Sequence, residues 1–238
     1  KGSREALLHA ADLARAGLAG TLRAYRMEFA DGRIAALQDL DYKGQPAGYA
    51  SQPGEVVNYV ENHDNPTLWD INALKLAQAT TAQERARVQL LGAAFVAFSQ
   101  GVAYFHAGMD VLRSKSLDRN SFDSGDAFNR LDWTYMDNGF GAGLPPKADN
   151  GRDWALLKPV LRNPQVKPSP GEIAWMRDAF RDLLRIRAST PLLRLDSAAE
   201  VSRRLAFRNT GPGQNPLVVV GHLIGDGMQG AFREVLYL

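Results

Sequence analysis

The stretch EVVNYVENHDNP (residues 55–66) decides the predicted fold. Residues 55–60 form a short run rich in β-branched and aromatic side chains, which is typical of a buried strand. The polar side chains of His63, Asp64 and Asn65 follow directly, and Pro66 ends the pattern. We therefore expect a strand that presents these polar groups at its C-terminal end, where parallel α/β folds hold their ligands.

The elements after this strand predict a parallel arrangement. A helix is expected over about residues 70–79, and Thr81 and Glu84 form a capping box that opens a second helix ending near Phe98. Gly101 ends that helix, and residues 102–106 form a second short apolar run. The order strand, helix, helix, strand is typical of a parallel α/β fold.

The remaining segments divide into helices, one long loop and a β module. Apolar spacing predicts a helix within residues 5–29, and Ser169 with Glu172 predicts another over residues 169–189. Residues 108–169 lack periodicity but carry aromatic side chains, so we expect an ordered, functional loop. Alternating patterns at 199–208, 216–223 and 231–237 predict antiparallel strands. We therefore assign residues 1–190 to an α/β domain and residues 191–238 to the start of a β domain.

Composition excludes several classes of protein. The 238 residues contain 28 Lys and Arg against 26 Asp and Glu, and the resulting charge of +2 argues against a nucleic-acid partner. The absence of Cys excludes disulfide scaffolds, Cys-ligated zinc and thiol nucleophiles. No apolar run approaches the roughly 18 residues that a membrane-spanning helix needs. The chain begins at Lys1 with no initiator Met, so we expect it to start within a longer protein, with the upstream part of the same polypeptide as its partner.

The pair His63-Asp64 suits the recognition of sugar hydroxyls. Both side chains can hydrogen-bond hydroxyl groups, and a carboxylate also stabilises the positive charge of an oxocarbenium-like transition state. Two alternatives stay open: a capping cluster ahead of the next helix, and a metal phosphohydrolase with a His-Asp dyad. The second alternative needs further histidines in the same core, and His106 and His222 fall in predicted strands.

The loop RSKSLDRNSFDSGDAFNR (residues 113–130) is the second candidate site. It mixes Arg, Asp and Asn with aromatic rings, which suits a neutral polyhydroxylated ligand. A loop held together by its own salt bridges is the alternative. Its acidic residues lack the spacing of a calcium loop, so we predict no metal site and no cofactor and leave calcium open.

These two stretches resemble the pullulanase and limit-dextrinase type debranching enzymes of the α-amylase superfamily. The resemblance extends through GVAYFHAGMDVLRSKSLDRNSFDSGDAFNRLDW (101–133), GLPPKADNGRDWALLKPVLRNPQVKPSPGE (143–172), TPLLRL (190–195) and AFRNTG (206–211). It implies the C-terminal portion of a (β/α)8 TIM barrel followed by part of an antiparallel β-sandwich. It also implies an α-glucan as ligand and retaining cleavage of α-1,6 glucosidic branch linkages.

The resemblance places one of the three family carboxylates in this chain. Asp64 corresponds to the Asp that stabilises the transition state, whereas residues 1–54 contain neither the nucleophile motif nor the general-acid motif. The remaining implied positions bind sugar, and they are His63, Asn65, Arg119, Asn120, Asp126, Asn129 and Arg130. Because a retaining glycosidase needs two carboxylates flanking the bond, we expect the isolated chain to be inactive. A non-catalytic α-glucan-binding remnant is the alternative.

Two positions depart from the family pattern. Ala127 stands where the family usually has Trp, which removes a stacking surface, and Glu61 stands where a small residue is common and adds a carboxylate expected near His63. The sequence does not fix a compartment, and the resemblance slightly favours an extracellular or periplasmic protein.

Overall fold

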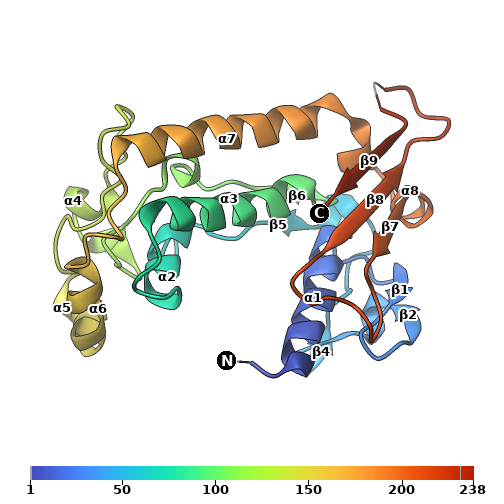
Figure 1. Cartoon of the computed structure of the whole chain (residues 1–238), viewed down its shortest axis with the longest axis horizontal. Helices are drawn as coiled ribbons and strands as arrows, with labels where there is room; N and C mark the ends of the chain where they lie inside the picture. The colour runs from blue at the N-terminus through green and yellow to red at the C-terminus, as the bar shows by residue number, and fades with distance from the viewer. Residues whose placement is uncertain (1, 231) are drawn as a thin grey trace. The chain divides into compact units, whose positions relative to one another are not determined.

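The computed structural model describes residues 2–230 and 232–238 and contains two compact units (Figure 1). The first unit comprises residues 1–58, 97–104 and 185–238, and the second comprises residues 59–96 and 105–184. Lys1 and residue 231, where the last strand is predicted to begin, lie outside the described residues.

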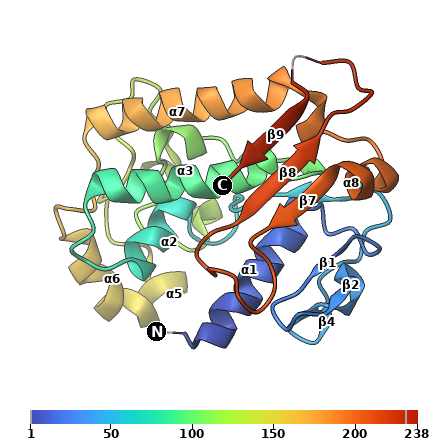
Figure 2. The same cartoon turned by 45° about the vertical axis from the view of Figure 1, so that its right-hand side comes forward.

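The first unit combines three small antiparallel sheets with one parallel strand pair. Its elements are α1 (Arg4–Leu18), β1 (Arg26–Glu28), β2 (Ile34–Ala36), β3 (Asp41–Tyr42), β4 (Gln45–Pro46), β5 (Val57–Asn58), β6 (Val102–Ala103), α8 (Ala198–Arg204), β7 (Leu205–Arg208), β8 (Val220–Ile224) and β9 (Glu234–Tyr237). Strands β5 and β6 pair in parallel, which confirms the predicted parallel arrangement of these two segments. The C-terminal sheet has the order β7-β8-β9 and is antiparallel, with α8 beside it (Figure 2).

Aromatic packing supports the C-terminal sheet of the first unit. Gly221 on β8 lies opposite Tyr237 on β9, and the Tyr237 ring stacks on Phe98 with ring centroids 5.5 Å apart. Tyr25 donates its hydroxyl to the Leu205 carbonyl at 2.9 Å and meets Phe207 edge-on. These contacts fix the sheet against other parts of the same unit.

Arg187 binds several carbonyl groups near the parallel strands. Its Nη1 donates to the carbonyls of Ala97, Ser99 and Leu193 at 2.7–2.9 Å, and its Nη2 donates to Gly101 at 3.0 Å. Only the planar guanidinium offers several donors in fixed directions, so this position requires Arg.

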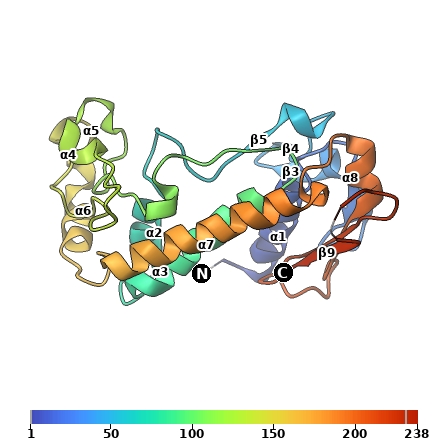
Figure 3. The ribbon, with the colours of Figure 1, turned by 90° about the horizontal axis from the view of Figure 1, so that it is seen from above.

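The second unit is helical and contains most of the long loop. Its elements are α2 (Leu68–Lys75), α4 (Asp126–Asn129), α5 (Lys147–Asn150), α6 (Trp154–Leu161), and most of α3 (Ala82–Phe98) and α7 (Pro170–Ser189), whose last residues belong to the first unit. Helix α7 runs alongside α3 (Figure 3). The predicted capping boxes are confirmed, because Glu84 accepts from the Thr81 amide at 2.9 Å and Glu172 accepts from the Ser169 amide at 2.6 Å.

The structure corrects three predicted elements. The strand expected over 55–60 is shorter and consists only of β5. Among the described residues it pairs with one neighbouring strand, β6, and its other side is therefore uncovered. Val57 is accordingly 54% exposed. The strand expected over 199–208 begins as helix α8, since Ser197 caps it and Glu200 pairs with Arg203 and Arg204. The loop expected over 108–169 contains helix α6.

Candidate functional site

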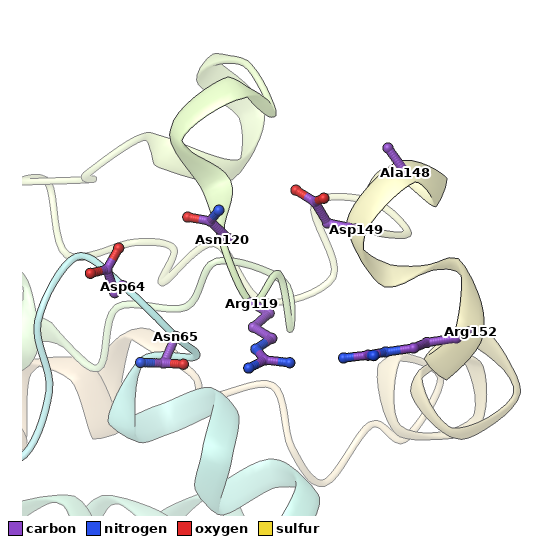
Figure 4. Close-up of a pocket in the computed structure, with 7 residues that line it drawn as sticks. All are labelled: Asp64, Asn65, Arg119, Asn120, Ala148, Asp149 and Arg152. Atoms are coloured by element: carbon purple, nitrogen blue, oxygen red, sulfur yellow. The ribbon is translucent and has the colours of Figure 1, made fainter.

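A polar cavity in the second unit has a volume of about 610 Å³ and brings together four of the predicted site residues (Figure 4). Asp64, Asn65, Arg119 and Asn120 line it, together with Ala148, Asp149 and Arg152. The cavity therefore joins the two stretches that the sequence singles out, 63–65 and 113–130, and adds a third, residues 148–152, from α5 and the 3₁₀ helix that follows it.

The segment that carries Asp64 is a tight turn ahead of helix α2. The Asp64 amide donates to the Asn62 Oδ1 at 2.9 Å, and Asn65 adopts the left-handed backbone conformation with φ of 61°. Thr67 then caps α2 by accepting from the Asp70 amide at 3.2 Å. His63 and Asp64 are 81% and 64% exposed, with the His63 Nε2 3.6 Å from the Asp64 Oδ1. The helix cap is thus Thr67, and the side chains of His63 and Asp64 stay accessible to a ligand.

The buried side chains of Asp70 and Lys115 hold the turn that carries Asp64. The Asp70 carboxylate accepts from the Ser114 hydroxyl at 2.5 Å and from the Lys115 amide at 2.8 Å. Complete burial nevertheless raises the pKa of Asp70 to about 6. The Lys115 side chain is buried as well, its Nζ donates to the His63 carbonyl at 3.0 Å, and burial lowers its pKa.

The wall formed by Arg119 and Asn120 is fixed through its backbone. The buried Asp118 Oδ1 accepts from the Asn120 amide at 3.0 Å and from the Asn150 side-chain amide at 3.1 Å. The Asn150 Oδ1 accepts in turn from the Arg119 amide at 3.2 Å. Because these bonds hold the main chain, the side chains of Arg119 and Asn120 remain available to the cavity.

The other four predicted residues are not in this lining: His63 lies beside Asp64 in the exposed turn, and Asp126, Asn129 and Arg130 lie elsewhere. Asp126, Ala127 and Arg130 line a second cavity of about 410 Å³ in the same unit. Asn129 donates its side-chain amide to the carbonyls of Ser121 and Gly125 at 2.7 and 3.0 Å, so its side chain braces the loop. The structure therefore does not bring Asp126, Asn129 and Arg130 into the cavity that Asp64 lines.

Glu61 is expected near His63, and in the structure its carboxylate contacts His106 and the Leu68 amide. Its buried carboxylate lies 3.3 Å from the Nδ1 of His106, whose Nε2 lies 3.4 Å from the Nη1 of Arg113, and it also accepts from the Leu68 amide. Glu61 thus connects the start of α2 to the segment after β6.

Ala148, Asp149 and Arg152 are the cavity residues that the sequence analysis missed. They lie on α5 and the 3₁₀ helix Gly151–Asp153, within the segment predicted as irregular. The short polar run KADNGRD (147–153) gives no periodic signal, and although it lies within a stretch that carries the family resemblance, no residue of it was predicted to bind the ligand.

The lining is electrically balanced, since two carboxylates face two guanidinium groups and two carboxamides. Such a mixture offers acceptors and donors to hydroxyl groups without favouring either sign of charge. Across residues 2–230 and 232–238, no three His, Asp or Glu side chains gather closely enough to form a metal site. None of the described helices is long and apolar enough to span a membrane.

Comparisons with known proteins agree with one another. Residues 135–238 match the family model described as alpha-1,6-glucosidases, pullulanase-type, C-terminal. Pullulanase 1 of the chloroplast from Arabidopsis thaliana is 45% identical over 215 residues, which cover 90% of this chain and 22% of that protein. Among solved structures, PulA from Klebsiella oxytoca aligns with a TM-score of 0.93 at 36% identity, over 98% of this chain and 23% of that one.

A second solved structure carries a sugar. Klebsiella pneumoniae pullulanase complexed with maltotriose aligns with a TM-score of 0.91 at 36% identity, over 96% of this chain and 22% of that one. The chain therefore has the fold of the matching region of these proteins, and it spans about a fifth of their length.

Proposed function

This chain belongs to the family of pullulanase-type alpha-1,6-glucosidases, and we propose that it forms the glucan-holding part of such an enzyme, with Asp64 as its transition-state-stabilising carboxylate. The substrate would be a branched α-glucan such as pullulan, starch or a limit dextrin. The observation that carries this proposal is the cavity that Asp64 shares with Asn65, Arg119 and Asn120.

The side chains of this cavity fit the proposed role. Asp64 is an accessible carboxylate at the end of the segment that follows β5, and it can face the positive charge that develops on a sugar ring during cleavage. The guanidinium of Arg119 and the amides of Asn65 and Asn120 can bind the hydroxyl groups of the same saccharide. His63 lies beside Asp64 and supplies a further hydroxyl partner.

The order and pairing of the elements along the chain support a barrel portion as the scaffold. The parallel strands β5 and β6 are connected through α2 and α3, which is the strand–helix–strand connection of a (β/α)8 barrel. The antiparallel order β7-β8-β9 supports the start of a β-sandwich after residue 190. In this proposal the nucleophile and the general acid belong to other strands of the barrel, so the 238 residues alone do not hydrolyse the glycosidic bond.

Calorimetric titration of the chain with maltotriose tests the proposal. We expect maltotriose to bind and the β-linked cellotriose to bind much more weakly. Asp64→Asn and Arg119→Ala should each weaken maltotriose binding about fivefold or more, because each removes a charged hydrogen-bonding group. Circular dichroism establishes that each variant is folded.

Matched variants outside the cavity control for unspecific effects. Asp196→Asn and Arg87→Ala alter exposed residues of the same types and should leave maltotriose affinity unchanged. Equal affinity for the two trisaccharides, or full affinity in both cavity variants, contradicts the proposed binding site. Release of reducing sugar from pullulan by the chain itself contradicts the placing of the nucleophile and general acid outside it.

A further inference from the structure

We propose that Glu61 is a positioning residue, whose buried carboxylate closes the turn that presents Asp64 to the cavity. This role rests on the proposed function, and neither the sequence motifs nor the family resemblance assigns it. The observation behind it is one hydrogen bond across the turn, because the Glu61 carboxylate accepts from the amide of Leu68, the first residue of α2.

Glu61 and Leu68 lie at the two ends of the segment that carries the proposed ligand-binding side chains. Between them are Asp64 and Asn65, which line the cavity (Figure 4). Asn65 takes the left-handed backbone conformation with φ of 61°, which persists in a residue with a Cβ atom only where the surrounding structure holds it. A bond that joins the two ends restricts the conformations of the whole segment, so Glu61 supplies such a constraint.

The Glu61 carboxylate is fixed by a second set of contacts in the same unit. Its side chain is 1% exposed, and its Oε1 lies 3.3 Å from the Nδ1 of His106, whereas Leu68 binds the Oε2. The Nε2 of His106 lies 3.4 Å from the Nη1 of Arg113, and the Nη2 of Arg113 donates to the Asn129 carbonyl at 3.1 Å. The two oxygens of Glu61 therefore have separate partners, and the contact with His106 limits the rotation of the carboxylate.

The burial of the Glu61 carboxylate favours positioning over general stabilisation. Removing a carboxylate from water is costly, and a buried ion pair often stabilises a protein no more than apolar side chains of similar volume. What the carboxylate adds is direction, because a hydrogen bond to the Leu68 amide requires the acceptor oxygen at one place. Loss of this oxygen is therefore expected to loosen the turn more than it destabilises the unit.

Amide hydrogen exchange and calorimetric titration of the chain test this role. In Glu61→Leu the Leu68 amide should exchange about tenfold faster or more than in wild type, and maltotriose affinity should fall about fivefold. Glu61→Gln keeps an acceptor oxygen, so it should retain slow exchange and lose less than about twofold in affinity. Glu234→Leu removes an exposed carboxylate that contacts His222 at 2.9 Å in the first unit, and this matched control should behave as wild type.

Removing the donor instead of the acceptor gives a second, independent variant. Leu68→Pro lacks the amide hydrogen, and the first position of a helix tolerates proline. The preceding Thr67 has ψ of 165°, which is compatible with a following proline. Leu68→Pro should lower maltotriose affinity about as much as Glu61→Leu, whereas Leu68→Ala keeps the amide and should bind as wild type.

A double-mutant cycle shows whether Glu61 acts through Asp64. In the Asp64→Asn background, Glu61→Leu should change maltotriose affinity less than about twofold, because the carboxylate that the turn presents is already absent. An equal loss of affinity in both backgrounds shows a merely structural effect and overturns the positioning role.

The outcomes separate the role of Glu61 from the proposed function. If wild type binds maltotriose and both Glu61→Leu and Leu68→Pro retain full affinity, the positioning role is wrong and the proposed function stands. Slow exchange of the Leu68 amide in folded Glu61→Leu also contradicts it, because the amide then has another acceptor. If wild type does not bind maltotriose, the proposed function is wrong, and the exchange rates alone decide whether Glu61 closes the turn.

Discussion

The ammonium group of Lys115 donates a hydrogen bond to the main-chain carbonyl of His63 at 3.0 Å. Lys115 is 1% exposed, so the ammonium group that holds His63, the neighbour of Asp64, belongs to a buried side chain. Burial lowers the pKa of Lys115, and neighbouring carboxylates, with Asp118 and Asp70 foremost, counteract that effect. This contact connects the segment after β6 to the turn that carries the proposed catalytic carboxylate.

Replacing Lys115 tests whether it positions the Asp64 turn. Lys115→Met keeps much of the volume but removes the donor, so we expect unfolding free energy to fall by about 1–3 kcal/mol. Maltotriose affinity should fall severalfold at a temperature where the variant is fully folded. Lys43→Met, at an exposed lysine of the first unit, is the control for loss of charge. Full sugar affinity in folded Lys115→Met contradicts the positioning role.

A cationic sugar analogue tests the proposed electrostatic role of Asp64. A protonated iminosugar carries positive charge at the ring, as the transition state of glycoside cleavage does, so the chain should bind it more tightly than glucose. Asp64→Asn should abolish this preference, whereas Asp196→Asn should retain it. The ratio of the two affinities is measured by competition against maltotriose, and a preference that survives Asp64→Asn shows that another group provides the negative charge.

Asp70 gives the stability of the chain a defined pH dependence. Its pKa is about 6 in the folded chain and near 3.8 when unfolded, so the unfolded state ionises first as the pH rises. Asp70 therefore contributes most favourably below about pH 4, and this contribution is lost as the pH rises through 6. The full change corresponds to roughly 3 kcal/mol.

Urea unfolding of wild type and of Asp70→Asn at pH 4, 5, 6 and 7 measures this effect as the difference between their free energies of unfolding. The stability of wild type relative to Asp70→Asn should decrease from pH 4 to pH 6 and then level off. Other titrating groups cancel in the difference because both proteins contain them. A difference that stays constant, or that rises with pH, contradicts the raised pKa of Asp70.

Gly221 tests the packing of the C-terminal sheet. A methyl group at this position would come within 2.1 Å of the Tyr237 ring, which stacks on Phe98. Gly221→Ala should therefore lower the unfolding free energy by about 1–3 kcal/mol, seen as a lower Tm. Gly213→Ala has open space around the added methyl group and should change Tm little.

Helix starts were predictable because their chemistry is local. Thr81 with Glu84 and Ser169 with Glu172 make their hydrogen bonds within one turn, so the sequence alone identifies both capping boxes. Helix α8 had the same kind of local signal, since Glu200 pairs with Arg203 and Arg204. The alternating apolar pattern of the same stretch favoured a strand, and the prediction of a strand there is wrong.

The composition of the cavity was only partly predictable because it depends on distant contacts. Family motifs pointed to Asp64, Arg119 and Asn120, but the placing of Asp149 and Arg152 depends on bonds that Asn150 makes to residues about thirty positions earlier. The pairing of Glu61 with His106 likewise joins residues 45 positions apart. Spacing along the chain carries no signal for either contact.

A crystal structure of the chain soaked with maltotriose tests the central claim most directly. We predict electron density for the sugar in the cavity of the second unit, with a hydroxyl group within hydrogen-bonding distance of the Asp64 carboxylate and another at Arg119. Density for the trisaccharide at any other place, with this cavity empty at saturating sugar, would contradict the account.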